Sequence, residues 1–474
     1  MAHASPFTDR LIYVDAIPGA MVERSSDSYL GSVTGTRRVL RFALPSVVMM
    51  VFISSYNVVD GAFISNYVDT DALASLNIMM PVFSLVTGVG FMFATGGSAY
   101  VSNLFGKGEP DMARAAFTQI IIAVTAVSVA FTLFGSVFVE DIASLSGADE
   151  ALLDGCVEYT RVYLFFTVFL ILQFVTNQFL VVAGRPSVAL YSSIAGGISN
   201  IVLDYLFIAV LGWGLEGAAA ASGIGSLVPS CVALALFADR RMYVRFAKPA
   251  RGVAAIASSL SNGVSEMVSE VSGGVTVLCY NLVMMRYIGA DGVAAISILS
   301  YVEFLALSVV IGYSNGVAPL MSFRHGAGDR PGIRNLFRTS MLFVSVLSVS
   351  VFAMMELFAG SVAGLFAQSS DSVMDLVEHG ATVYAFGFLF MGINVYASSM
   401  FTSLSNGKVS AWISFVRTLL LLAPLIILLP VAFGIDSVWF AVPVTEAVTV
   451  TMVVLILRRL DGRYGYLSGD GPSS

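Results

Sequence analysis

Charged residues are scarce in this chain. Of its 474 residues, 12% are charged and 57% are hydrophobic, whereas ordinary soluble domains carry about 25% charged residues. This shortage excludes a water-exposed surface of the usual kind. Apolar stretches of about 20 residues recur along the chain, and each is long enough to cross a hydrocarbon core of roughly 30 Å as a helix. We therefore expect an all-α membrane protein.

Cysteine and histidine are also rare. The three cysteines are too few and too scattered for a disulfide framework or a metal site; they are Cys156, Cys231 and Cys279. The three histidines fall in an expected tail and in expected loops, which excludes an intramembrane metal cluster; they are His3, His325 and His379. No pattern typical of nucleic-acid binding is present. We expect neither an enzyme nor a cofactor, and no nucleic-acid partner.

Twelve apolar stretches fit membrane-spanning helices. The first six are 42–66, 74–103, 116–139, 159–183, 188–212 and 216–238. The second six are 255–286, 292–322, 337–359, 380–404, 409–432 and 437–457. The resulting division is a cytosolic tail at 1–36, an N-lobe at 37–240, a cytosolic linker at 241–254, a C-lobe at 255–458 and a cytosolic tail at 459–474.

The distribution of Lys and Arg predicts the orientation. Most of these residues lie in loops that the twelve-span arrangement places on one side of the membrane. The connection between the two halves alone carries Arg240, Arg241, Arg245, Lys248 and Arg251. Cytoplasmic loops are enriched in Lys and Arg, so both termini are predicted to be cytosolic and the protein to lie in the plasma (cell inner) membrane. The N-terminal residues MAHASPFTDR do not resemble a signal peptide.

The two halves of the chain repeat each other. Residues 73–117 align without a gap to 293–337, at an offset of 220 residues. The matches include glycine and polar positions, such as Gly106 with Gly326 and Arg114 with Arg334. Because each half has an even number of spans, the repeats are parallel and related by a pseudo-twofold axis along the membrane normal. Two such six-helix bundles suit alternating access, although a channel or receptor with an ancient duplication is the alternative.

Two acidic residues lie well inside spans of the first half. Asp60 stands in FISSYNVVDGAFIS, and Asp204 follows Asn200 by four residues, which places both side chains on one helical face. Intramembrane carboxylates are costly and normally functional. Their oxygens suit a hard cation such as Na⁺, and removal from water also favours the protonated form. The sequence leaves Na⁺ and H⁺ both open as coupling ions, as well as structural hydrogen bonding without titration.

The second half carries its own intramembrane charges. Glu266 and Glu270, four residues apart, share one helical face and are second-lobe candidates for ion coupling. Glu303, Arg417 and Glu446 are further charges within spans. Because an unpaired buried guanidinium is expensive, we expect Arg417 to neutralise an acid of the bundle.

Several motifs resemble those of the multidrug and toxic compound extrusion (MATE) transporters, within the multidrug/oligosaccharide-lipid/polysaccharide flippase superfamily. Pro45 followed by Asp60 resembles the family's first-helix proline and cation-site aspartate. NQFLVVAGRP, which begins at Asn177, is similar to the fourth-helix motif, and GKGEPDMARAAF and GAGDRPGIRNLF resemble the paired loops after helices two and eight. Asn200 and Asp204 match the fifth-helix pair.

The resemblance implies a cation site in the N-lobe and an exporter. The site would consist of Asp60, Asn200, Asp204 and Ser222, where Ser222 stands at a position that often carries Thr, and the first three would ligate Na⁺ in a sodium-coupled protein. Pro45 would bend its helix. NGVSE lacks the proline that is common in the seventh helix, so the resemblance assigns no role to Glu266 or Glu270.

The sequence thus predicts a monomeric antiporter that exports cationic or amphipathic small organic compounds across the lipid bilayer in exchange for Na⁺ or H⁺. The alternative is a lipid-linked oligosaccharide flippase of the same superfamily. Such a flippase requires a basic central cavity for pyrophosphate, and Arg417 is the one clearly intramembrane base in the sequence.

Overall fold

The computed structural model describes residues 29–68, 70–150, 152–366 and 371–467, and every regular element within them is a helix. The first-half elements are α2 (Tyr29–Ser32), α3 (Thr36–Tyr67), α4 (Thr70–Gly106), α5 (Pro110–Val137), α6 (Val139–Leu145), α7 (Leu153–Val182), α8 (Pro186–Asp204), the π-helical turn η1 (Tyr205–Val210) and α9 (Gly214–Phe237). The second-half elements are α10 (Ala254–Tyr287), α11 (Ala290–Gly326), α12 (Arg330–Phe366), α13 (Asp371–Ser403), α14 (Gly407–Phe415), the π-helical turn η2 (Val416–Leu422), α15 (Ala423–Phe433), the 3-10 turn η3 (Ile435–Phe440) and α16 (Ala441–Tyr464).

Twelve helical spans in the described residues are long and apolar enough to cross a membrane, which confirms the predicted all-α class and span count. Several helices are longer than predicted. At 1.5 Å per residue, the 37 residues of α4 and of α11 reach beyond a hydrocarbon core of roughly 30 Å. Hydropathy detects only the part in lipid, whereas helical hydrogen bonding continues through polar end turns. For the same reason α3 begins at Thr36, before its apolar run.

Two histidine placements were wrong. His325 lies in the last turn of α11 and not in a loop, and its half-buried ring contacts that of Tyr464 at 5.6 Å between centroids. His379 lies in α13, where it is exposed. His3 lies outside the described residues.

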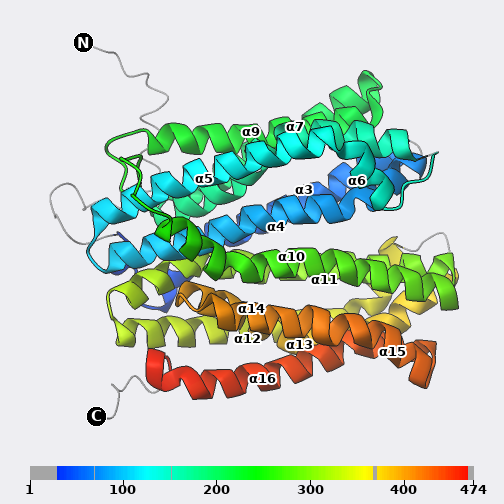
Figure 1. The fold of residues 1–474 in the computed structure, drawn as a ribbon. Helices are drawn as coiled ribbons and strands as arrows, with labels where there is room; N and C mark the ends of the chain where they lie inside the picture. Colours follow the sequence, from blue (N-terminus) through cyan, green and yellow to red (C-terminus); the bar gives the residue numbers. More distant parts are fainter. Residues whose placement is uncertain (1–28, 69, 151, 367–370, 468–474) are drawn as a thin grey trace.

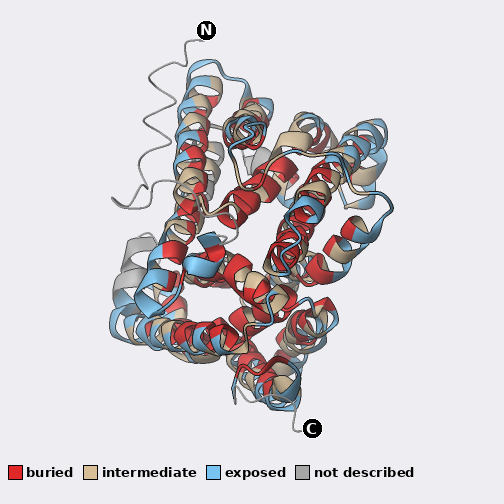
Figure 2. Cartoon of the chain, turned by 90° about the vertical axis from the view of Figure 1, so that its left-hand side faces the viewer, coloured by how far each residue is buried: buried red, intermediate tan, exposed pale blue. Residues whose placement is uncertain are grey.

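The helices of each half gather together, as Figure 1 shows, with the first half in blue to green and the second half in green to red. One hydrophobic core is built mainly from α4, α5 and α7, and others from second-half helices. Figure 2, which looks along the helices, shows buried residues turned toward neighbouring helices and exposed residues on the outside. Many large apolar side chains are exposed, as expected for a surface in contact with lipid.

Backbone geometry repeats between the halves. Gly108 and Gly328 lie in the middle of the loops after α4 and α11, with positive φ angles of 77° and 69°. Gly184 has a φ of 74°, and its counterpart Ser405 has a φ of 58° even though it carries a side chain. A non-glycine residue seldom adopts this conformation. The turn is therefore set by the repeated architecture and not by the local residue.

The two halves contact each other reciprocally. A Cβ atom on Gly106 of α4 would lie 2.0 Å from the carbonyl oxygen of Phe323 in α11, and one on Gly326 would lie 2.1 Å from that of Asn103 in α4. Each residue of one contact is 220 positions from its counterpart in the other. Such reciprocity is expected of contacts around a twofold axis. Only glycine permits this backbone approach.

A second close approach joins α4 to α10. A Cβ atom on Gly96 would lie 2.0 Å from the carbonyl oxygen of Ser259, and one on Gly263 would lie 1.9 Å from that of Met92. These contacts, like those of Gly106 and Gly326, lie toward the end of the bundle that carries the Lys- and Arg-rich loops, which we call the basic end. The two halves are therefore packed backbone to backbone at the basic end.

A short N-terminal segment also lies at this end. Leu30 of α2 and Val33 after it are buried. The guanidinium of Arg324, in the last turn of α11, donates to the carbonyl oxygen of Val33 at 2.7 Å and forms an ion pair of 2.7 Å with Asp329. Residues 29–35 are thereby tied to the second half before α3 begins in the first.

Candidate cation site and a second polar centre

The four residues of the predicted cation site come from three helices of the first half. Asp60 lies on α3, Asn200 and Asp204 on α8, and Ser222 on α9. Asp204 is the last residue of α8, immediately before the π-helical turn η1, and is 0% exposed. Such π-helical turns occur frequently at functional sites. The local widening of the helix thus coincides with the most deeply buried acid.

Direct interactions connect these residues. The carboxyl groups of Asp60 and Asp204 are close enough to interact directly. The amide nitrogen of Asn200 donates to the hydroxyl of Ser222 at 3.3 Å. Asn200 and Asp204 lie one turn apart on the same helical face. The structure therefore brings all four residues into one polar centre, which we call the N-site.

The N-site has too few hydrogen-bond donors for its acceptors. Oδ1 of Asp60, Oδ1 of Asn200 and both carboxylate oxygens of Asp204 are buried and have no hydrogen-bond partner among the described residues. An ionised carboxylate and an amide oxygen can only accept, and leaving such groups buried without a partner costs several kcal/mol. A proton or a hard cation would satisfy them. The N-site therefore presents several oxygen acceptors of the kind that a hard cation prefers.

Sequence reasoning missed two tyrosines at the N-site. Tyr159 on α7 lies near enough to both Asp60 and Asp204 to interact electrostatically. Tyr56 lies one turn before Asp60 on α3 and is hydrogen-bonded to Gln173. The spacing of Tyr56 and Asp60 offered a signal. Tyr159 offered none, because an aromatic residue in an apolar helix is usually a packing residue.

The remaining first-half candidates lie elsewhere in the fold. Asn177 of α7 donates its amide hydrogen to the hydroxyl of Ser193 at 3.0 Å. At an offset of 221 residues, Ser398 and Ser414 form the corresponding contact in the second half at 3.1 Å. Asn177 thus takes part in a helix contact that the repeat preserves. Pro45 lies inside α3, which continues through it as one helix.

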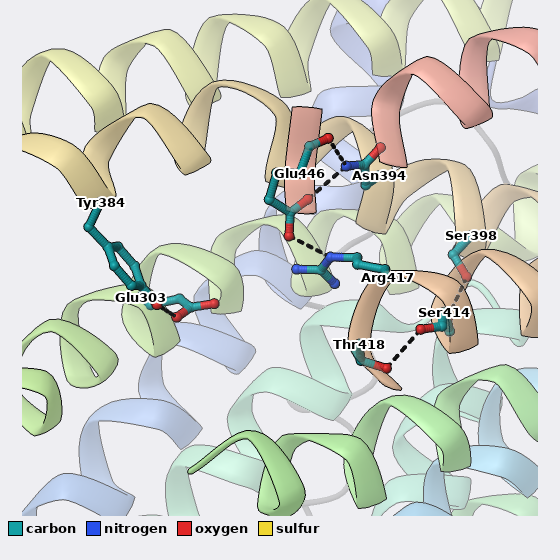
Figure 3. A network of polar contacts seen from close by, with 8 residues as sticks. All are labelled: Glu303, Tyr384, Asn394, Ser398, Ser414, Arg417, Thr418 and Glu446. Atoms are coloured by element: carbon teal, nitrogen blue, oxygen red, sulfur yellow. Dashed lines mark hydrogen bonds and ion pairs between the residues drawn. The ribbon is translucent and has the colours of Figure 1, made fainter. Parts of the chain in front are cut away.

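The second half holds a polar centre of different composition, drawn in Figure 3. Nε of Arg417, on the π-helical turn η2, lies 2.6 Å from Oε1 of Glu446 on α16. Asn394 donates to Oε2 of Glu446 at 2.7 Å and to its backbone carbonyl at 3.0 Å. The acid that Arg417 neutralises is therefore Glu446, which is 1% exposed. We call this arrangement the C-site.

Glu303 of α11 flanks the C-site. Its carboxylate accepts a hydrogen bond from the hydroxyl of Tyr384 on α13. It is also close enough to Arg417 to interact electrostatically. Figure 3 shows Glu303 and Tyr384 to the left of the guanidinium and Glu446 above it. Both acids of the C-site therefore have a donor supplied by the protein.

Glu266 and Glu270 do not belong to the N-site. Glu266 of α10 lines a cavity of about 40 Å³ in the second half, together with Arg417, Asn394 and several serines. This volume has room for a few water molecules. Glu270 is close enough to Glu266 for electrostatic repulsion, and its Cβ lies 3.4 Å from the position of a Cβ on Gly88 of α4.

Comparison with known proteins gives one consistent result. The MatE family model matches residues 45–206 and 253–428. The multidrug export protein MepA of Staphylococcus aureus (strain MSSA476) is 21% identical over 432 residues, which cover 90% of this chain and 94% of MepA.

Solved structures agree in fold. An outward-facing multidrug resistance MATE family transporter of the MOP superfamily superposes with a TM-score of 0.87 at 21% identity, over 94% of this chain and all of its own. A MATE structure in complex with MaL6 gives 0.86 at 21% identity, over 92% and 98%. The likeness extends over nearly the whole chain and includes both halves.

Proposed function

Because the chain belongs to the MatE family, we propose that it is a multi-pass transporter of the plasma membrane that exports small organic compounds in exchange for Na⁺ or H⁺. The fold, the family and the multidrug export relatives support efflux of several compounds by one protein. Cationic or amphipathic compounds are the substrate class that we propose. We further propose that the protein acts as a monomer, since each chain supplies both halves.

The observation that carries the coupling proposal is the group of buried acceptor oxygens in the N-site. Four such atoms, on Asp60, Asn200 and Asp204, lack a donor among the residues that the structure describes. A bound Na⁺ would be ligated by these oxygens and the hydroxyl of Ser222. A proton shared between Asp60 and Asp204 would remove part of the same deficit. Both ions relieve the repulsion between two adjacent carboxylates, so both are retained as candidates.

Coupling then follows from a difference in affinity between two states. The two halves are packed together at the basic end, through Gly96, Gly106, Gly263 and Gly326. If that end is cytoplasmic, as the excess of Lys and Arg in its loops supports, this arrangement closes the cytoplasmic side. We propose that ion occupancy of the N-site and substrate binding favour different arrangements of the halves, since a ligand shifts an equilibrium only by its differential affinity.

The flippase alternative receives no support from the C-site. A pyrophosphate group requires an available positive charge, whereas the guanidinium of Arg417 is bound to Glu446 and flanked by Glu303. The intramembrane base is thus already neutralised by the protein.

Proteoliposomes test the proposal. We expect purified full-length protein to move a fluorescent organic cation when an inward gradient of Na⁺ or of H⁺ is imposed separately, and one of the two to be effective. Asp60→Asn and Asp204→Asn should abolish the response to that gradient. Glu266→Gln is the matched control, an intramembrane acid outside the N-site, and should retain it. Unchanged coupling in both aspartate variants would place the coupling site elsewhere.

A further inference from the structure

An apolar groove runs along the outside of the second half, between α10 and α14. Its volume is about 940 Å³. The residues that line it are Met92, Ala257, Leu260, Ser261, Val264, Met267, Val268, Lys408, Ala411, Trp412 and Phe415. All but Met92 belong to α10 and α14, and Met92 belongs to α4 of the first half. The groove therefore lies at the seam between the halves.

The groove faces away from the polar interior. On α14 its residues follow helical spacing along one face, from Lys408 through Ala411 and Trp412 to Phe415. The opposite face of the same segment, with Ser414 and Arg417, lines the polar cavity of the second half. Trp412 is 53% exposed. Since α10 and α14 both belong to membrane spans, the medium that this exposed apolar surface meets is lipid.

The extent of the groove matches one leaflet. From Ala257 to Val268 the lining residues cover eleven steps along α10, or about 16 Å at 1.5 Å per residue. Half of a hydrocarbon core is roughly 15 Å. The groove begins near the basic end, where Gly407 packs so closely on α10 that a Cβ would lie 2.1 Å from the carbonyl oxygen of Ser261. It thus follows the depth of a single acyl chain from the basic end inward.

One charge lies in this apolar lining. Lys408 is exposed, and within the described residues no hydrogen bond or ion pair engages its ammonium group. It stands on the first turn of α14, at the end of the groove nearest the membrane surface. A lysine at this depth extends its ammonium group to the headgroup level, where it attracts anionic lipid. None of the described residues that line the groove is acidic, so none competes for it.

We propose that the groove between α10 and α14 binds one anionic phospholipid of the leaflet at the basic end. An acyl chain lies along Val264, Val268 and Phe415, and the phosphate group lies at Lys408. Because Met92 comes from the other half, the bound lipid contacts both halves where α4 packs on α10. The lipid stabilises that packed arrangement. This site is separate from the N-site and does not depend on which ion or substrate is transported.

Native mass spectrometry of the purified full-length protein tests whether the charge of Lys408 selects anionic lipid. The probes are phosphatidylglycerol and phosphatidylcholine with identical acyl chains. We expect the wild type to prefer phosphatidylglycerol by about fivefold, the effect of one lysine near a membrane surface. Lys408→Gln should lose the preference, and Arg459→Gln, which removes an exposed cation at the same end, should keep it. Equal binding of both lipids by the wild type, or an unchanged preference in Lys408→Gln, would overturn the proposal.

A second pair of variants tests the groove itself. Ala257 is exposed, so Ala257→Trp fills the groove without overpacking the core, and it should reduce retention of both lipids. Val454→Trp, at an exposed position of α16, is the control and should leave retention unchanged. If Ala257→Trp instead displaces a fluorescent organic cation and leaves lipid retention intact, the groove is a substrate path and the lipid proposal is wrong. Lipid binding is measured without transport, so its failure is distinct from failure of the exporter proposal.

Discussion

The two halves of this transporter differ in how their buried carboxylates are stabilised. Each buries carboxylates within the membrane. In the C-site, Glu446 has Arg417 and Asn394 as donors, and Glu303 has Tyr384. In the N-site, the oxygens of Asp60 and Asp204 that are buried have no donor in the described part of the chain.

The difference indicates where an external ion acts. A carboxylate that is already paired with a cation of the protein is stabilised little by binding a second cation. A pair of carboxylates without a donor is stabilised much more by a bound cation, because burying an unpaired charge is the largest electrostatic penalty in either centre. We therefore expect the C-site to maintain the structure of its half and the N-site to respond to ions.

Removing the guanidinium of Arg417 should lower the stability of the protein more than any other change to the C-site. Arg417→Met leaves Glu446 buried with only an amide donor, and breaking a buried ion pair on one side typically costs about 3–5 kcal/mol. Chemical unfolding of the purified protein in detergent should show that loss. The double variant Arg417→Met/Glu446→Gln removes the orphaned charge and should recover most of the stability. Equal unfolding midpoints for the wild type and the single variant would show that the pair is not structural.

An internal donor placed in the N-site should remove its response to ions. In the wild type, an ion at about 100 times its dissociation constant should add about 2.7 kcal/mol of stability. Asp60→Asn supplies an amide donor beside Asp204 and removes one of the two charges, so this gain should disappear. Thermal unfolding with Na⁺ replaced by choline, and at several pH values, measures it.

The C-site double variant provides the matched control for that experiment. Arg417→Met/Glu446→Gln should keep the ion-dependent gain even where its baseline stability is lower. An ion response that disappears in the C-site variant and survives in Asp60→Asn would reverse the assignment of the two centres.

These centres also show how far sequence reasoning extends. Hydropathy placed Asp60 and Asp204 inside membrane spans, and helical periodicity placed Asn200 and Asp204 on one face. The resemblance to a family added Ser222 and grouped the four residues into one site. The structure brings the four together. Hydropathy gave the twelve spans because it measures the property that holds a helix in lipid. In each of these cases the information is local, within one helix or one motif.

The C-site pairing could not be predicted in the same way. Arg417 and Glu446 lie on different helices, and their contact depends on the rotation of α16 and on the π-helical turn at Arg417. No pattern in either segment encodes that rotation. Tyr159 likewise lies near Asp60 and Asp204 only because of how α7 packs against α8 and α9. Contacts between helices follow from packing of the whole bundle, which a single sequence does not display.

Loss of a neutral hydrogen-bond donor from the C-site should lower the stability of the protein moderately. Tyr384→Phe keeps the ring but leaves Glu303 without its hydroxyl donor, and an unsatisfied buried acceptor costs about 1–3 kcal/mol. Chemical unfolding should report this loss, which should be smaller than that of Arg417→Met. Tyr396→Phe is the control, because the hydroxyl of Tyr396 is buried with no hydrogen-bond partner in the described residues. A loss in Tyr396→Phe as large as that in Tyr384→Phe would contradict a specific role for the Glu303 contact.

The smallest effect should come from the hydroxyl at the edge of the N-site. Ser222 accepts the amide hydrogen of Asn200 at 3.3 Å and supplies a neutral oxygen, so Ser222→Ala should weaken the ion-dependent stabilisation without abolishing it. A neutral hydrogen bond contributes about 0.5–1.5 kcal/mol, equivalent to a change in ion affinity of about two- to tenfold. Ser222→Thr retains the hydroxyl and should stay near wild type. If alanine and threonine reduce ion affinity equally, side-chain packing at this position and not its oxygen determines the response, and Ser222 is not a ligand of the N-site.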